Sequence, residues 1–146
     1  MYNQLYYLAS LIEFLARRLH CYPSAVADSI GLDAMRRIFA CAEAYHCSKI
    51  DDVAEEIIED LGLVEGGEYD PTKTAGSYPT HWVVGKIYAR LVEVLCQKKQ
   101  SDPVNTLWEV YHSFLSPKIQ NFNLDIYYQG TRYLVESYQE GEILEA

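Results

Sequence analysis

The sequence predicts an all-α fold, a single-domain bundle of six or seven helices with one long loop in the middle. Its 146 residues match one domain of ordinary size. Apolar residues recur at helical spacing along most of the chain, and Pro, Gly and Asp residues mark helix starts and stops between these segments. We therefore expect residues 1–146 to form one helical domain, with helical halves 1–63 and 80–139 joined by the loop 64–79.

The first helix is expected over residues 4–20. Its apolar residues follow a helical stripe, made up of Leu5, Leu8, Leu11, Ile12, Leu15 and Leu19. Glu13 and Arg17 lie on the opposite side of the same helix, away from the leucines. The pattern therefore predicts a buried leucine face and a solvated Glu13.

Three further helices are expected before the loop. Pro23 and Ser24 open a short helix that ends at Gly31. A third helix, over 33–45, has Asp33 as its cap. Ser48 then opens a strongly acidic helix that stops at Gly62.

The second half of the chain predicts the remaining helices. Thr80 is expected to cap the longest helix. Asp102 is expected to cap the next helix, which has a proline in its first turn and ends before Ser116. A last helix is expected over 124–138. Gly130 weakens this prediction, and a short strand over 124–128 is the alternative.

Composition limits the classes of function. The formal charge is −9, with 21 acidic against 12 basic residues, which disfavours nucleic acid as a partner because binding it requires neutralising phosphates. No apolar stretch approaches the roughly 20 residues of a membrane span. The N-terminus lacks the basic start of a signal peptide, so we expect a cytoplasmic protein with reduced cysteines and no membrane association.

The expected function is protein binding without catalysis. The chain has 13 tyrosines, which suit either a wet helical core or a surface that meets a partner. The acidic helix places Asp52, Glu56 and Asp60 on one stripe. None of the common catalytic motifs is present, and no cofactor is expected. The interpretation is an interaction module that binds another protein, with a second copy of the chain as one possible partner.

A DNA-binding helix–turn–helix is the main alternative. Val26 to Leu32 resembles the first helix and glycine turn of that motif. Arg36 and Arg37 would then lie on the second helix, which enters a groove. The motif normally buries an apolar residue where Arg37 stands, and acidic residues follow.

A small-molecule or anion site around the loop is a further alternative. Tyr69, Lys73 and Tyr78 lie in the loop, and His81 and Trp82 follow in the first turn of the next helix. Free backbone N–H groups at a helix N-terminus favour an anion, and the same position favours the neutral form of His81.

A metal site is the weakest alternative. His20 and Cys21 lie at one expected helix end, and His46 and Cys47 lie at another. Four such donors could form a tetrahedral zinc site. However, adjacent donors lack the usual Cys-x-x-Cys spacing, so we predict no metal.

The first 60 residues are similar to small all-helical bacterial proteins of unknown function that are associated with mobile elements and toxin–antitoxin neighbourhoods. The segments that carry this resemblance are Leu11-Ile12-Glu13-Phe14, Pro23-Ser24-Ala25-Val26-Ala27, Tyr45-His46 and Ile50-Asp51-Asp52-Val53. The resemblance implies a bacterial or phage source and an accessory, antitoxin-like role in binding a partner. It supplies no catalytic residues.

Overall fold

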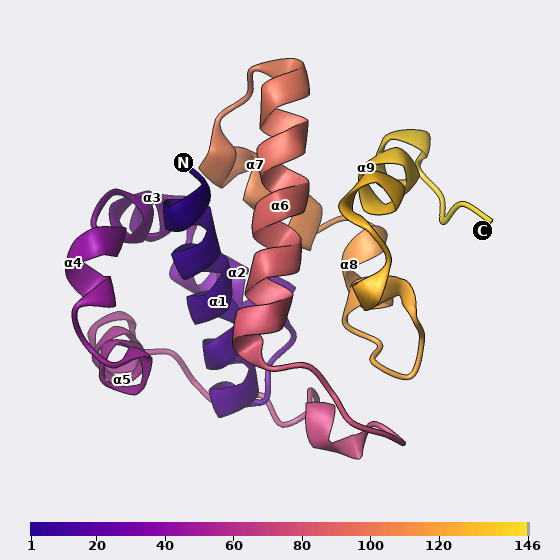
Figure 1. Cartoon of the computed structure of the whole chain (residues 1–146). Coiled ribbons are helices and arrows are strands. Elements are labelled where there is room, and N and C mark those ends of the chain that lie inside the picture. Colours follow the sequence, from indigo (N-terminus) through magenta and orange to yellow (C-terminus); the bar gives the residue numbers. More distant parts are fainter. Residues whose placement is uncertain (146) are drawn as a thin grey trace.

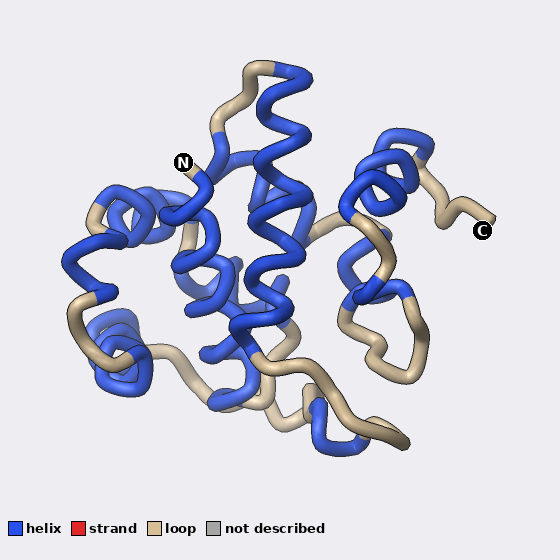
Figure 2. Tube along the Cα trace, in the orientation of Figure 1, coloured by secondary structure: helices blue, strands red, loops and turns tan. Residues whose placement is uncertain are grey.

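The computed structural model describes residues 1–145 and is helical throughout (Figure 1). Loops connect the helices, and no strand is present in the described residues (Figure 2). The predicted all-α class is confirmed. The helices are α1 (Tyr2–Leu19), α2 (Pro23–Ile30), α3 (Leu32–Ala40), α4 (Ala42–His46), α5 (Ile50–Leu61), α6 (His81–Lys99), α7 (Pro103–Tyr111), α8 (Leu115–Ile119) and α9 (Thr131–Glu140), with 3-10 turns η1 (Pro71–Lys73) and η2 (Ile126–Tyr128).

The helix count differs from the prediction for local reasons. Residues 1–145 hold nine α-helices rather than six or seven. The helix expected over 33–45 is interrupted at Cys41, which separates α3 from α4. The region 124–138 is divided as well, because η2 precedes α9, and Gly130 is the N-cap of α9. The alternative of a strand over 124–128 was wrong.

Several predicted caps are confirmed by hydrogen bonds. The side chains of Thr80 and Asp102 each accept a hydrogen bond from the backbone N–H three residues later. Gly62 ends α5 in the left-handed conformation, with φ of 64°. Ser48 does not cap α5, because the helix begins after Lys49 and no side chain caps it. α3 likewise begins after Gly31, two residues earlier than the predicted Asp33 cap requires.

The antiparallel pair α1 and α6 forms the centre of the molecule (Figure 1). The two helices approach each other closely at Ser10 and Gly85. A Cβ atom on Gly85 would lie 2.8 Å from the Cα of Ser10, so glycine is required for this approach. The other helices pack around this pair and complete one hydrophobic core.

Helix α1 is buried on nearly all sides, which corrects the prediction for Glu13. That side chain has an exposed fraction of 0% and is not solvated. α1 contacts α2, α3, α4, α5, α6 and α7, so almost none of its circumference faces water. None of the helices in residues 1–145 is long and apolar enough to cross a membrane.

Candidate functional site

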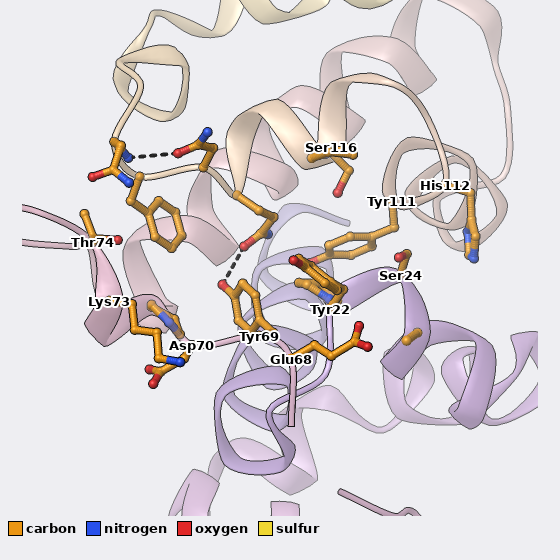
Figure 3. A pocket seen from close by; sticks show the side chains of 18 of the residues that line it. Tyr22, Ser24, Glu68, Tyr69, Asp70, Lys73, Thr74, Tyr111, His112 and Ser116 are labelled. Atoms are coloured by element: carbon orange, nitrogen blue, oxygen red, sulfur yellow. Dashed lines mark hydrogen bonds between the residues drawn. The ribbon is translucent and has the colours of Figure 1, made fainter. Parts of the chain in front are cut away.

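A pocket of about 770 Å³ opens between the start of α2, the segment 68–74 and the chain from α7 to residue 123 (Figure 3). This volume is in the range of sites that hold small organic molecules. The walls combine aromatic rings and prolines with hydroxyl, amide and charged groups. Three parts of the chain that are far apart in sequence therefore meet around one concave surface.

A buried hydrogen-bond network lies beneath this pocket, with the Glu13 carboxylate at its centre. The Tyr111 hydroxyl donates to Oε2 of Glu13 over 2.9 Å. The Gln120 amide nitrogen donates to both carboxylate oxygens, at 3.1 and 3.0 Å. The Tyr69 hydroxyl donates to Oε1 of Gln120 over 2.7 Å (Figure 3). Tyr69, Tyr111 and Gln120 also line the pocket, so the network forms its floor.

Two more side chains extend the network toward α6 and α8. The Gln120 amide nitrogen lies 3.2 Å from the Tyr88 hydroxyl, and the oxygens of Tyr88 and Ser116 are 2.7 Å apart. The rings of Tyr88 and Tyr111 stack with centroids 4.2 Å apart. Because the participants come from α1, α6, α7, α8 and the loop, the network links the central helix pair to the pocket wall.

Burial changes the acid–base properties of this network. Desolvation raises the pKa of Glu13 to about 7, although hydrogen bonds from Gln120 and Tyr111 and the charge of Arg17 act in the opposite direction. Desolvation also raises the pKa values of Tyr69, Tyr88 and Tyr111. The three phenols are therefore neutral hydrogen-bond donors at physiological pH, whereas Glu13 exchanges a proton near neutrality.

Arg17 lies beside this network with its guanidinium between two aromatic rings. The guanidinium carbon is 5.7 Å from the ring centroid of Tyr78 and 5.8 Å from that of Phe122. Its Nε and Nη2 atoms are buried without a hydrogen-bond partner in residues 1–145. Phe122 lines the pocket but Arg17 does not, so this charge lies behind the pocket wall.

The charged groups at the pocket rim are arranged unevenly. The Asp70 carboxylate accepts hydrogen bonds from the backbone and hydroxyl of Thr72, which lower its pKa, and the charge of Lys73 lowers it further. The Lys73 side chain lies next to Asp70 (Figure 3). Glu68 is exposed and forms no ion pair within residues 1–145. The rim thus has two carboxylates and one ammonium group, none of them in an ion pair within residues 1–145.

The five candidate residues around the loop occupy two separate places. Tyr69 and Lys73 line the pocket, whereas Tyr78, His81 and Trp82 do not. The rings of His81 and Trp82 have centroids 4.9 Å apart, and Tyr78 faces Arg17.

His81 has the low proton affinity that its sequence position predicts, but the main cause is different. Desolvation lowers its pKa to about 4, and the nearby Arg17 charge contributes. The imidazole is therefore neutral at physiological pH.

Most of the lining residues are absent from the candidates drawn from the sequence, including Tyr22, Tyr111 and Gln120. Tyr22 precedes α2, Tyr111 ends α7, and Gln120 follows α8. Tyr111 belongs to the apolar stripe of its helix, so periodicity predicts a core residue and gives no sign of its hydroxyl. Gln120 has no local signal, because its neighbours in the network come from distant parts of the chain.

The two candidate DNA-binding arginines differ in their surroundings. The Nη2 atom of Arg36 donates to the Asn105 side-chain oxygen over 2.6 Å and lies 3.8 Å from the Asp102 carboxylate. Arg36 thus takes part in the contact between α3 and α7. Arg37 is exposed on α3.

The candidate metal donors are not gathered at one point. No three His, Cys, Asp or Glu side chains within residues 1–145 are placed to hold a metal ion together. Nδ1 of His20 is 3.2 Å from the Tyr69 carbonyl oxygen, and His46 stacks on Trp82. The thiols of Cys21 and Cys47 donate to backbone carbonyl oxygens.

Asp52, Glu56 and Asp60 are all exposed on α5. None of the three forms an ion pair in the described part of the chain, whereas their neighbour Glu55 accepts a hydrogen bond of 2.8 Å from Nε of Arg18.

The tyrosines are less exposed than a tyrosine-rich surface would require. Three of the 13 are exposed, namely Tyr22, Tyr78 and Tyr128.

Comparison of the chain with protein-family models, with curated proteins and with solved structures finds no match.

Proposed function

We propose that this chain is a small-molecule-binding protein and that the pocket over Glu13 is its binding site. The observation that carries the proposal is the combination of a 770 Å³ pocket with a floor of buried, hydrogen-bonded polar side chains. Recognition sites in proteins commonly pair apolar walls with a few polar groups at fixed positions. The loop alternative from the sequence is the expectation closest to this proposal.

The energetic cost of the network supports a functional role. A fully buried carboxyl loses its hydration, and its hydrogen bonds only partly offset that loss, as the raised pKa of Glu13 indicates. Apolar side chains of similar volume would make the helix packing as stable or more stable. Titratable groups with perturbed pKa values are concentrated at functional sites. A network of this kind under a pocket therefore favours recognition of a ligand over simple packing.

The geometry favours binding over catalysis. Glu13 titrates near neutrality, but its carboxylate is fully buried and is separated from the pocket by Tyr111 and Gln120. His112 also lines the pocket. One of its ring nitrogens lies 2.7 Å from the Asp28 carboxylate and the other 2.7 Å from the Trp108 carbonyl oxygen. The Glu13 carboxylate is thus out of reach of a bound molecule, and both ring nitrogens of His112 already contact protein oxygens.

The proposal can be tested by two-dimensional ¹H–¹⁵N NMR, for which a chain of 16.8 kDa is well suited. The protein is titrated with a set of small cationic, neutral and anionic compounds. We expect at least one class to shift the amide signals of segment 68–74 and residues 111–123. Ala25→Trp places an indole in the pocket, since Ala25 is an exposed lining residue, and should abolish these shifts.

Ser29→Trp is the matched control for this experiment. Ser29 is exposed on the same helix and does not line the pocket. Its variant should bind as the wild type does. If no compound class shifts the pocket signals, or if both variants respond alike, the pocket is not a binding site.

Protein binding through α5 is a second candidate function. It is supported by the exposure of Asp52, Glu56 and Asp60 without ion-pair partners in residues 1–145, and by the resemblance to small bacterial accessory proteins. A basic or amphipathic protein in a bacterial cytoplasm, or a second copy of this chain, would be the partner. Neutralising the three carboxylates as Asn, Gln and Asn should weaken capture of that partner from the host. Unchanged capture would contradict a role for this surface, and capture of nucleic acid would favour the Arg36 and Arg37 alternative.

A further inference from the structure

Aromatic rings form much of the pocket wall. Tyr22, Tyr69, Tyr111 and Phe122 all line it. The rings of Tyr22 and Tyr69 have centroids 5.4 Å apart and planes inclined by 51°, so they form a corner rather than a flat stack. Tyr111 lies next to this corner (Figure 3). Ring faces carry negative partial charge, and several inclined faces around one space attract a cation.

The hydrogen bonds of two of these tyrosines strengthen this property. Tyr69 donates its hydroxyl proton to Gln120, and Tyr111 donates to the Glu13 carboxylate. A phenol that donates to an acceptor becomes more electron-rich, because hydrogen-bonded groups polarise one another in a medium of low dielectric constant. Tyr69 and Tyr111 are nearly fully buried, so these electron-rich rings act on the pocket from its floor, behind the exposed ring of Tyr22.

Among the charged side chains that line the pocket, carboxylates outnumber ammonium groups, while the Arg17 guanidinium lies behind the wall at Phe122. Two carboxylates, Glu68 and Asp70, and one ammonium group, that of Lys73, belong to the lining. Asp70 is engaged by Thr72 and lies beside Lys73, which leaves Glu68 without an ion-pair partner in residues 1–145. The net charge of the whole chain, −9, has the same sign.

We infer that the ligand of this pocket is a small organic cation with a quaternary or tertiary ammonium group, held against the exposed ring of Tyr22 and above the buried rings of Tyr69 and Tyr111, beside the Glu68 carboxylate. This inference rests on the proposed binding function and adds the chemical class of the ligand. The pocket, at about 770 Å³, is larger than an ammonium group, so the remainder of the molecule extends toward the hydroxyl and amide groups of Ser113 and Asn121.

Two probes of nearly the same shape test the charge requirement. Choline carries a trimethylammonium group, and 3,3-dimethylbutan-1-ol is its neutral carbon analogue. Both are titrated into the full chain and followed through the amide signals of segment 68–74. We expect choline to bind about tenfold more tightly than the neutral alcohol, as cation–π contacts and one carboxylate would produce.

Substitutions at exposed positions test the residues. Tyr22→Leu and Glu68→Gln should each weaken choline binding severalfold and leave binding of the neutral alcohol nearly unchanged. Tyr128→Leu is the matched control, because Tyr128 is an exposed tyrosine that does not line the pocket. Equal loss in the control and in Tyr22→Leu would overturn the assignment.

The outcomes separate this inference from the proposed function. If the neutral alcohol binds as tightly as choline, the inference is wrong and the pocket remains a binding site. If neither probe shifts the pocket signals, the inference also fails. The binding function itself fails only when the wider set of cationic, neutral and anionic compounds leaves those signals unshifted.

Discussion

Replacing Glu13 by glutamine should lower the free energy of unfolding at acidic pH and raise it at alkaline pH. Folding raises the pKa of this carboxyl from 4.5 to about 7 because the group is buried. At about 1.4 kcal/mol per pKa unit, the ionised side chain costs roughly 3 kcal/mol of stability above pH 7. Between about pH 4.5 and 7, the native state keeps a proton on Glu13 that the unfolded state has lost. The contribution of Glu13 to the free energy of unfolding therefore falls as pH rises through this range and is constant above it.

Glutamine removes this titration and keeps the shape of the side chain. In the variant, the amide oxygen can still accept a hydrogen bond from Tyr111. Its NH₂ group, however, faces the Gln120 amide nitrogen, which in the wild type donates to both carboxylate oxygens. One rearranged hydrogen bond costs about 1 kcal/mol. We therefore expect Glu13→Gln to be less stable than the wild type by about 1 kcal/mol near pH 4.5 and more stable by about 2 kcal/mol at pH 8.

Urea unfolding from pH 4.5 to 8.5 measures this difference. The lowered pKa of His81 makes native stability rise with pH between about 4 and 6.5, opposite to the effect of Glu13, but it acts equally in both proteins and cancels in the difference. Glu59→Gln, an exposed change on α5, is the control and should follow the wild type. Equal destabilisation of the Glu13→Gln variant at both ends of the range would show that burial does not raise the pKa of Glu13.

Substitutions at three other positions test the helix packing, the network and a helix cap. Gly85→Ala should destabilise by about 1–3 kcal/mol because its Cβ would meet the backbone of Ser10, and urea unfolding measures the loss. Tyr69→Phe leaves the Gln120 side-chain oxygen without its 2.7 Å donor, which should cost about 1–3 kcal/mol and lower Tm by several degrees in a thermal melt. Asp102→Ala removes the cap of α7 and should cost about 1 kcal/mol, whereas Asp102→Ser should retain most of that stability.

The sequence predicts the helical class and several helix boundaries because these depend on local chemistry. Thr80 and Asp102 cap their helices through atoms only three residues away, so the pattern alone is sufficient. At Cys41, local chemistry is not sufficient to predict the helix boundary. Nothing in its neighbourhood distinguishes one continuous helix from the two that the structure contains.

The pocket could be predicted only in part because its chemistry depends on contacts between distant residues. The loop prediction includes Tyr69 and Lys73, since a long polar segment before a helix is a common place for a site. Periodicity predicts a solvated Glu13 because it identifies one apolar stripe and carries no information on what covers the other side of the helix, where Glu13 is buried. Its partner Gln120 is 107 positions away in sequence, so no spacing rule connects them.

The most direct test of the central claim is a crystal structure of the chain with the tightest-binding compound from the NMR screen. We expect electron density for that compound between Tyr22, Tyr111 and Gln120, with its cationic group within about 6 Å of the ring centroids. Density on another surface, with this pocket containing only solvent, would contradict the claim that the buried network around Glu13 supports a ligand site.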